Sequence, residues 1–164
     1  MLERFYPDHE KDSVYKLDFE GFYAKGYRGI IFDVDNTLVP HGARADKRAA
    51  DFFQNLKEMG FSCCLLSNNK EERVKIFYKR VRVPYIHKAN KPSVKGYKKA
   101  MDLMKTDEKN TLFVGDQIFT DIYGANRTGI YSILVKPIHP REEIQIVFKR
   151  HLEKIILYFY EKKH

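Results

Sequence analysis

The amino-acid sequence predicts an α/β fold: a doubly wound, Rossmann-like and mostly parallel sheet of five strands flanked by helices. The first observation behind this prediction is a set of short runs that are apolar throughout, which is typical of strands covered on both faces. These runs span residues 29–33, 61–66, 83–86, 111–114 and 130–135. The second observation is that apolar residues recur at helical spacing between the runs. Strands that alternate with helices favour parallel pairing.

Each predicted helix lies between two of these strands, and the sequence marks its ends. The first helix is expected to end at Gly60, where a glycine suits a left-handed cap. Asn68 or Asn69 is expected to cap the second helix. The third is expected to begin near Ser93, and the fourth to run from about residue 119 to Gly129.

Length and end segments indicate how the chain is organised. The 164 residues fit one domain over 1–164, with a core over 28–137 and a C-terminal helical segment over 138–164. Residues 1–27 are expected to pack along the edge of the sheet. A helix is expected over 142–160, and three roles are open to it: to cover an edge, to form a dimer, or to touch a membrane surface.

Composition excludes several classes of protein. Hydrophobic residues make up 43% of the chain and charged residues 32%, which indicates a globular protein rather than a disordered one. The apolar stretch over 155–160 is too short to cross a bilayer, and the first residues carry no secretory signal. Cys63 and Cys64 are adjacent, so on a strand they point to opposite faces and form neither a disulfide framework nor a zinc site. We expect a cytoplasmic protein.

The net charge of +8 is concentrated in one segment. Residues 70–99 hold eleven Lys and Arg against two Glu, so this segment carries an excess of nine positive charges and the rest of the chain sums to −1. Such a run is either an ordinary solvated surface or a surface that faces an anion.

Polar side chains gather where the predicted strands end, the edge at which open α/β sheets bind ligands. They are Asp33, Asp35 and Thr37 after the first strand, Ser67 and Asn68 after the second, Lys91 before the third helix, and Asp116 and Asp121 after the fourth strand. Each alone would be a turn or cap residue. Together, crowded carboxylates repel one another unless a cation is present. Mg²⁺ suits such a set of oxygen ligands.

The spacing of these residues indicates phosphoryl transfer. Asp33 and Asp35 lie at i and i+2, so on an extended segment both side chains point the same way. One carboxylate can attack phosphorus while the other handles the proton. Lys91 can offset the charge of the phosphate and the nucleophile, and Ser67 and Asn68 can donate to phosphoryl oxygens.

These residues, in this order and on these elements, resemble the four motifs of the haloacid dehalogenase-like (HAD) superfamily. The motifs are Asp33-Val34-Asp35-Asn36-Thr37, Ser67, Lys91 and Gly115-Asp116 followed by Thr120-Asp121. The resemblance implies that Asp33 is a nucleophile forming an aspartyl-phosphate and that Asp35 is the general acid and base. The presence of Asp35 favours a phosphatase over a dehalogenase.

The resemblance also implies the remaining roles at the site. Thr37, Ser67, Asn68 and Lys91 are expected to bind the substrate phosphate. Asp33, the backbone carbonyl of Asp35, and Asp116 are expected to hold Mg²⁺, with Asp121 as an acidic partner near the metal.

Residues 67–69, 87–92, 115–121 and 126–129 are similar to YqeG-type members of HAD subfamily IIIA. The likeness covers about residues 1–137. The wider group resembles phosphatidylglycerophosphate phosphatases, which implies a phospholipid head group as a substrate.

Spacing also predicts that the site has no cap domain. Only residues 38–60 separate the first motif from the second strand, and residues 87–91 leave no room for another insertion. An uncovered site suits a large or membrane-associated phosphate ester. Peripheral contact with a membrane is therefore one expectation.

Two other functions compete with a phosphatase. A binding module for nucleic acid or a ribonucleoprotein would use the basic 70–99 segment with little or no catalysis, and its binding would be strongly salt-dependent. No stacking-aromatic RNA motif is evident, which disfavours nucleic acid. A receiver-type phosphoacceptor domain would place its acceptor Asp after the third strand, where this chain has His87-Lys88-Ala89.

Overall fold

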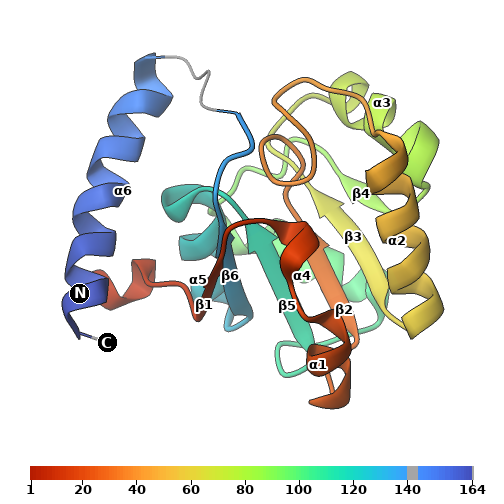
Figure 1. Cartoon of the computed structure of the whole chain (residues 1–164), viewed down its shortest axis with the longest axis horizontal. Coiled ribbons are helices and arrows are strands. Elements are labelled where there is room, and N and C mark those ends of the chain that lie inside the picture. Colours follow the sequence, from red (N-terminus) through yellow and green to blue (C-terminus); the bar gives the residue numbers. More distant parts are fainter. Residues whose placement is uncertain (140–143, 164) are drawn as a thin grey trace.

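A computed structural model describes residues 1–139 and 144–163 of the chain. One parallel sheet runs through the described part, with helices on both faces (Figure 1). The strands, in the order in which they lie side by side, are β1 (His9–Lys11), β6 (Tyr131–Val135), β5 (Thr111–Gly115), β2 (Gly29–Phe32), β3 (Ser62–Leu66) and β4 (Tyr85–Ile86). The α/β prediction is confirmed.

The helices occupy the expected intervals between the strands. The α-helices are α1 (Phe19–Ala24), α2 (Lys47–Met59), α3 (Glu71–Val81), α4 (Val94–Met104), α5 (Tyr123–Thr128) and α6 (Ile144–Lys163). Short 3-10 turns span η1 (Leu2–Phe5) and η2 (Val14–Lys16), and a π-helical turn spans η3 (Ile118–Ile122). The helix expected from about residue 119 to Gly129 is thus two consecutive elements, η3 and α5.

The described sheet has six strands, not the predicted five. The additional strand is β1, which pairs in parallel with β6 in the register His9 to Ile133 and Lys11 to Val135. The three residues of β1 are polar and only His9 is partly buried, so the apolar pattern that revealed the other strands is absent from β1. The expectation that residues 1–27 pack along the sheet edge is confirmed for this segment.

Successive side chains of the central strands enter two different cores. Ile30 and Phe32 pack with α1, α2 and α3 on one face, whereas Ile31 packs with α4 and α5 on the other. Cys63 and Cys64 divide in the same way, and both are free and buried. This two-sided burial is the reason why the strands read as continuous apolar runs.

Two helix caps follow the sequence and one does not. Gly60 and Gly129 adopt left-handed conformations after α2 and α5, at φ angles of 106° and 83°. Helix α3, however, begins after Lys70 with no side-chain cap. The expected caps Asn68 and Asn69 instead bind groups at the carboxyl edge of the sheet, as described below.

Helix α6 stands beside the β1–β6 edge of the sheet (Figure 1). Its residues Ile156 and Leu157 pack against Ile118 and Ile122 of η3. At its far end, the side chains of Lys163 and Glu3 form an ion pair, which brings the two chain ends together. The expected helix over 142–160 is therefore confirmed from Ile144 onward, and residues 142–143 lie outside the described part. No helix within residues 1–139 and 144–163 has the length and apolar character needed to span a membrane.

Candidate active site

The topology brings the predicted motifs to one edge of the sheet. Strands β3, β2 and β5 are neighbours, so Ser67, Asp33 and Asp116, which follow them, lie at adjacent carboxyl ends. The N–H of Asp33 continues the ladder by donating to the Val114 carbonyl at 3.0 Å. The first, second and fourth motifs therefore meet where a parallel sheet binds its ligand.

Lys91 joins two of the carboxylates. Its Nζ lies 2.8 Å from Asp33 Oδ1 and 2.7 Å from Asp121 Oδ1, and its side chain is 3% exposed. Burial lowers the pKa of Lys91, but Asp121 and Asp33 more than offset this effect and hold that pKa above its ordinary value. The lysine is therefore charged.

Asn68 fixes the backbone that carries Lys91. Its Oδ1 accepts the Lys91 N–H at 2.6 Å, and its Nδ2 donates to the Lys91 carbonyl at 3.2 Å. The following peptide bond, Lys91–Pro92, is cis. The side-chain amide of Asn68, expected to face the phosphate, is thus engaged with the loop of Lys91.

Thr37 lies between the carboxylates of Asp33 and Asp116. Its hydroxyl is 3.0 Å from Asp33 Oδ2 and 3.3 Å from Asp116 Oδ1. These two oxygens therefore face a common point at the Thr37 hydroxyl, while the other oxygen of Asp33 binds Lys91. Thr37 itself is almost fully buried.

Asp33, Asp116 and Asp121 together form a cluster that fits a hard divalent cation. Each offers one carboxylate oxygen, and the three oxygens lie within 4.8 Å of one another. Burial, and next the charge of Asp33, raise the pKa of Asp116 and raise that of Asp121 to about 6. Crowded, buried carboxylates of this kind need a compensating cation, and oxygen ligands favour Mg²⁺.

Asp121 is held by contacts outside the cluster. Its Oδ2 accepts the Gln117 N–H at 3.1 Å, and its backbone carbonyl accepts from the Tyr97 hydroxyl at 3.1 Å. Gly124 allows this approach, because a Cβ at that position would lie 2.2 Å from the Tyr97 oxygen. The buried Tyr97 of α4 thereby connects the core around α4 and α5 to the loop that carries Asp121.

Asp35 is turned away from the cluster and toward α3. Its Oδ1 accepts from Arg73 Nε at 3.1 Å and Nη2 at 2.9 Å, and its Oδ2 accepts from Asn69 Nδ2 at 2.6 Å. The N–H of Gly42 adds a bond of 2.7 Å to Oδ1. The side chain of Asp35 therefore lies outside the carboxylate cluster, and the residue was expected to offer the metal its backbone carbonyl only.

Ser67 is buried at the end of β3. Its hydroxyl oxygen accepts the Asn69 N–H at 3.1 Å. A hydroxyl that accepts one hydrogen bond keeps its own proton to donate. Ser67 is therefore a donor in a position beside the Asp33 strand.

Sequence reasoning missed two arginines of this site. Arg73 lies in the basic 70–99 segment and Arg150 in the expected C-terminal helix, and neither is predicted as a site residue. Arg150 binds both the backbone carbonyl and Oδ2 of Asp116. Neither contact leaves a local signal, because the partners are 38 and 34 residues apart.

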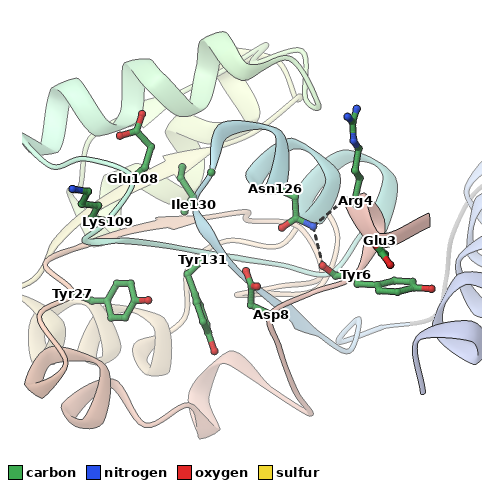
Figure 2. A pocket seen from close by; sticks show the side chains of 11 residues that line it. Glu3, Arg4, Tyr6, Asp8, Tyr27, Glu108, Lys109, Asn126, Ile130 and Tyr131 are labelled. Carbon is green, nitrogen blue, oxygen red and sulfur yellow. Dashed lines mark hydrogen bonds between the residues drawn. The ribbon is translucent and has the colours of Figure 1, made fainter. Parts of the chain in front are cut away.

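A polar cavity of 590 Å³ lies elsewhere in the molecule (Figure 2). Tyr131 and Lys109 line it, and these residues are at or near the amino ends of β6 and β5. Asn126 also lines the cavity, and its Nδ2 donates to the carbonyls of Arg4 at 2.9 Å and Tyr6 at 2.8 Å. None of the carboxylates of the cluster lines this cavity, so it is separate from the candidate active site.

Comparison with known proteins agrees with this geometry. Residues 88–145 match a family model described as HAD-hydrolase-like. The chain is 34% identical over 165 residues to the probable phosphatase YqeG of Bacillus subtilis, covering 99% of this chain and 96% of that protein. It is also 27% identical over 153 residues to a chloroplastic and mitochondrial phosphatidylglycerophosphate phosphatase 1 of Arabidopsis thaliana, covering 86% of this chain but only 44% of that protein.

Solved structures share the fold. NagD of Escherichia coli K-12 superposes with a TM-score of 0.57 at 13% identity, covering 74% of this chain and 91% of that one. A HAD-superfamily hydrolase of Ehrlichia chaffeensis gives a TM-score of 0.56 at 14% identity, covering 79% and 96%.

With the family-model match and the near full-length relative, the fold and the cluster of acids around a buried lysine identify a phosphatase of the HAD class. Within that class, the near full-length likeness shows that the chain belongs to the family of the Bacillus protein YqeG. The expected superfamily and enzyme class are thereby confirmed.

Proposed function

We propose that this protein is a Mg²⁺-dependent phosphatase that hydrolyses a phosphate monoester through an aspartyl-phosphate on Asp33. The observation that carries the proposal is the division of the Asp33 carboxylate between two neighbours. One oxygen is bound by Lys91 at 2.8 Å, and the other faces Asp116 across the hydroxyl of Thr37. A carboxylate that is fixed at the carboxyl edge of a parallel sheet, and whose charge is balanced by a buried lysine, is suited to nucleophilic attack.

In the first step, an Asp33 oxygen forms a bond to phosphorus while the bond from phosphorus to the ester oxygen breaks. Asp35 gives the departing oxygen its proton. In the second step, water attacks the phosphorus, Asp35 takes a proton from that water, and the bond to Asp33 breaks to release phosphate. Lys91, Ser67 and Thr37 are the proposed phosphate contacts, since each carries a donor at this edge.

The residues proposed to hold the metal are Asp33, Asp116 and the backbone carbonyl of Asp35, with Asp121 beside them. When bound, Mg²⁺ neutralises charge on the phosphoryl oxygens. The ion pairs of this edge join four carboxylates to only three cations, and the resulting net negative charge is one that such an ion would offset. The residues are Asp33, Asp35, Asp116 and Asp121 on one side and Arg73, Lys91 and Arg150 on the other.

A phospholipid head group such as that of phosphatidylglycerophosphate is the proposed substrate. Two relatives, from Arabidopsis thaliana and Chlamydomonas reinhardtii, are described as phosphatidylglycerophosphate phosphatases. Only residues 33–46 separate β2 from α2, and only residues 87–93 separate β4 from α4, so neither connection has room for a cap domain. An uncovered site suits an ester that remains in a larger surface.

Helix α6 supports peripheral contact with an anionic membrane. Phe148, Leu152, Ile155 and Phe159 recur at spacings of four, three and four, and their exposed fractions are 67%, 40%, 54% and 47%. They form one outward stripe on a helix whose other face packs on the protein. At helical spacing, Lys149, His151 and Lys162 lie on either side of this stripe. An apolar stripe flanked by cations is complementary to a bilayer of acidic phospholipids.

The catalytic proposal is tested by phosphate release from a panel of lipid, nucleotide, sugar and protein phosphates in the presence of Mg²⁺. We expect release from at least one ester and its complete loss in Asp33→Asn. Asp102→Asn is the matched control, because this aspartate is exposed on α4. Absence of release from the whole panel by the wild-type protein would contradict the proposal.

The membrane proposal is tested by sedimentation with phosphatidylglycerol and phosphatidylcholine vesicles. We expect binding to the acidic vesicles, lost when Phe148 and Ile155 are both replaced by Ser. Leu103→Ser is the control, because Leu103 is 50% exposed on a different helix. A dimer in solution that the double variant converts to a monomer would instead assign the stripe to a second copy of the chain.

The competing function, nucleic-acid binding by the basic segment, is disfavoured by the partners of its charges. Arg73 and Lys91 bind carboxylates of the candidate site, and Lys75 pairs with Glu71 at 3.5 Å. Tight, salt-dependent RNA binding that survives Asp33→Asn would nevertheless favour that function over the phosphatase.

A further inference from the structure

We propose that Arg150 of α6 is a positioning residue that orients the Asp116 carboxylate for metal binding, so that the C-terminal helix belongs to the catalytic unit. The inference rests on the proposed function, because it concerns the same metal site. It assigns a role to a helix that lies outside the four sequence motifs.

The two carboxylates that meet at Thr37 are held in the same way. Each has one oxygen on a basic side chain and the other turned toward the shared point. For Asp33, Oδ1 is bound by Lys91 and Oδ2 faces Thr37. For Asp116, Oδ2 is bound by Arg150 and Oδ1 faces Thr37. Arg150 thus does for Asp116 what Lys91 does for Asp33.

The contact with Arg150 fixes more than one atom of Asp116. One guanidinium nitrogen, Nη2, binds the carboxylate, and the other, Nη1, binds the backbone carbonyl of the same residue. A planar fork with two parallel donors restrains the direction of its partner, whereas an ammonium would supply charge alone. The side chain of Asp116 is fully buried and that of Arg150 is 16% exposed, so water does not screen the pair strongly.

Glu153 links Arg150 to the segment that follows Asp116. Its Oε2 lies 3.1 Å from Arg150 Nη1, and its Oε1 accepts the Ile118 N–H at 2.8 Å. Ile156, one turn further along α6, packs against Ile118 and Ile122. The helix is therefore anchored on the segment that directly follows Asp116.

The test is calorimetric titration of the full-length protein with Mg²⁺ and, as a second probe, Mn²⁺. Removing a side chain that orients a metal ligand costs about 10- to 100-fold in metal affinity. We expect a loss in this range for Arg150→Gln and a smaller loss for Arg150→Lys. Leu157→Ala is the matched control: it weakens the packing of α6 without touching Asp116, and its affinity should stay within about twofold of wild type.

Steady-state kinetics give a second reading of the same variants. If Arg150 acts on Asp116, the metal concentration for half-maximal activity rises in Arg150→Gln while kcat at saturating metal stays near wild type. Unchanged or tighter metal binding in Arg150→Gln, with α6 still helical by circular dichroism, would overturn the inference. So would an equal loss of affinity in Leu157→Ala, because it would reduce the effect to helix docking.

These results separate the inference from the proposed function. A wild-type protein that binds Mg²⁺ and loses this binding in Arg150→Gln, yet releases no phosphate, would support the role of Arg150 and contradict the phosphatase proposal. The reverse result is a wild-type protein that releases phosphate together with an Arg150→Gln variant that binds Mg²⁺ normally. It would support the phosphatase proposal and contradict the role of Arg150.

Discussion

Lys91 Nζ lies 2.8 Å from Asp33 Oδ1, and the lysine is buried at the carboxyl edge of the sheet. The two residues are 58 positions apart in the chain, so the contact depends on the packing of β2 beside β3 and β4. With the second bond from Lys91 to Asp121, this ion pair places one buried cation between two buried carboxylates.

Replacing Lys91 with Met should destabilise the metal-free protein. The change leaves Asp33 and Asp121 buried without their cation, and loss of one partner of a buried ion pair costs about 3–5 kcal/mol in the free energy of unfolding. Urea unfolding in the presence of a chelator measures this cost. Lys95→Met, on the exposed surface of α4, is the control. A loss below about 1 kcal/mol would show that the pair is not a main source of stability.

Mg²⁺ should raise the melting temperature of the protein, and the rise should depend on pH. Burial and the charge of Asp33 raise the pKa of Asp121 to about 6. Below that pH the carboxyl is protonated and attracts a cation less, so protons compete with the metal. We therefore expect the Mg²⁺-induced rise to be large at pH 7.5 and to shrink as pH falls through about 6.

Thermal melting at several pH values, with NaCl at matched ionic strength, measures this dependence. Asp116→Asn should remove most of the rise at every pH. A rise in melting temperature that is the same at pH 5 and pH 7.5 would contradict the carboxylate cluster as the binding site.

The central part of the fold could be predicted because continuous apolar runs in the sequence specify its strands. Strands β2, β3 and β5 are covered on both faces, and this requires every one of their side chains to be compatible with burial. Strand β1 could not be predicted, because its three residues lie at an edge and only backbone pairing with β6 defines them. Asn68 likewise looked like a helix cap, since only the tertiary structure brings Lys91 within its reach.

The acids of the site could be located because strand ends are marked in the sequence, but their cationic partners could not. Arg73 and Arg150 are long side chains on helices, where a charged residue is usually solvated. Their roles follow from the direction in which α3 and α6 approach the sheet edge. No residue type or spacing encodes that direction.

Replacing Tyr97 with Phe should loosen the loop of Asp121. The Tyr97 hydroxyl lies 2.8 Å from the Thr120 carbonyl and 3.1 Å from the Asp121 carbonyl, and the substitution removes both contacts without changing the ring. A buried acceptor left without its donor costs about 1–3 kcal/mol. Urea unfolding measures the loss, and Tyr158→Phe, which is 53% exposed, is the control. Equal stability of the two variants would contradict the prediction.

Arg73→Gln should reduce the rate most for substrates that need a proton on the leaving group. Arg73 and Asn69 hold the Asp35 carboxylate, which is the proposed general acid. An alkyl phosphate has a poor leaving group that must be protonated, whereas nitrophenolate departs without a proton. If the arginine positions Asp35, the rate of the first step, measured as release of the alcohol or of nitrophenol in a single turnover, should fall by about 10- to 100-fold with the alkyl ester and by much less with p-nitrophenyl phosphate, and Asp35→Asn should show the same ratio. Lys79→Gln, exposed on the same helix, should leave both rates unchanged. An equal fall in this first-step rate for both esters would mean that Arg73 acts on phosphate binding or on stability, and not through the acid.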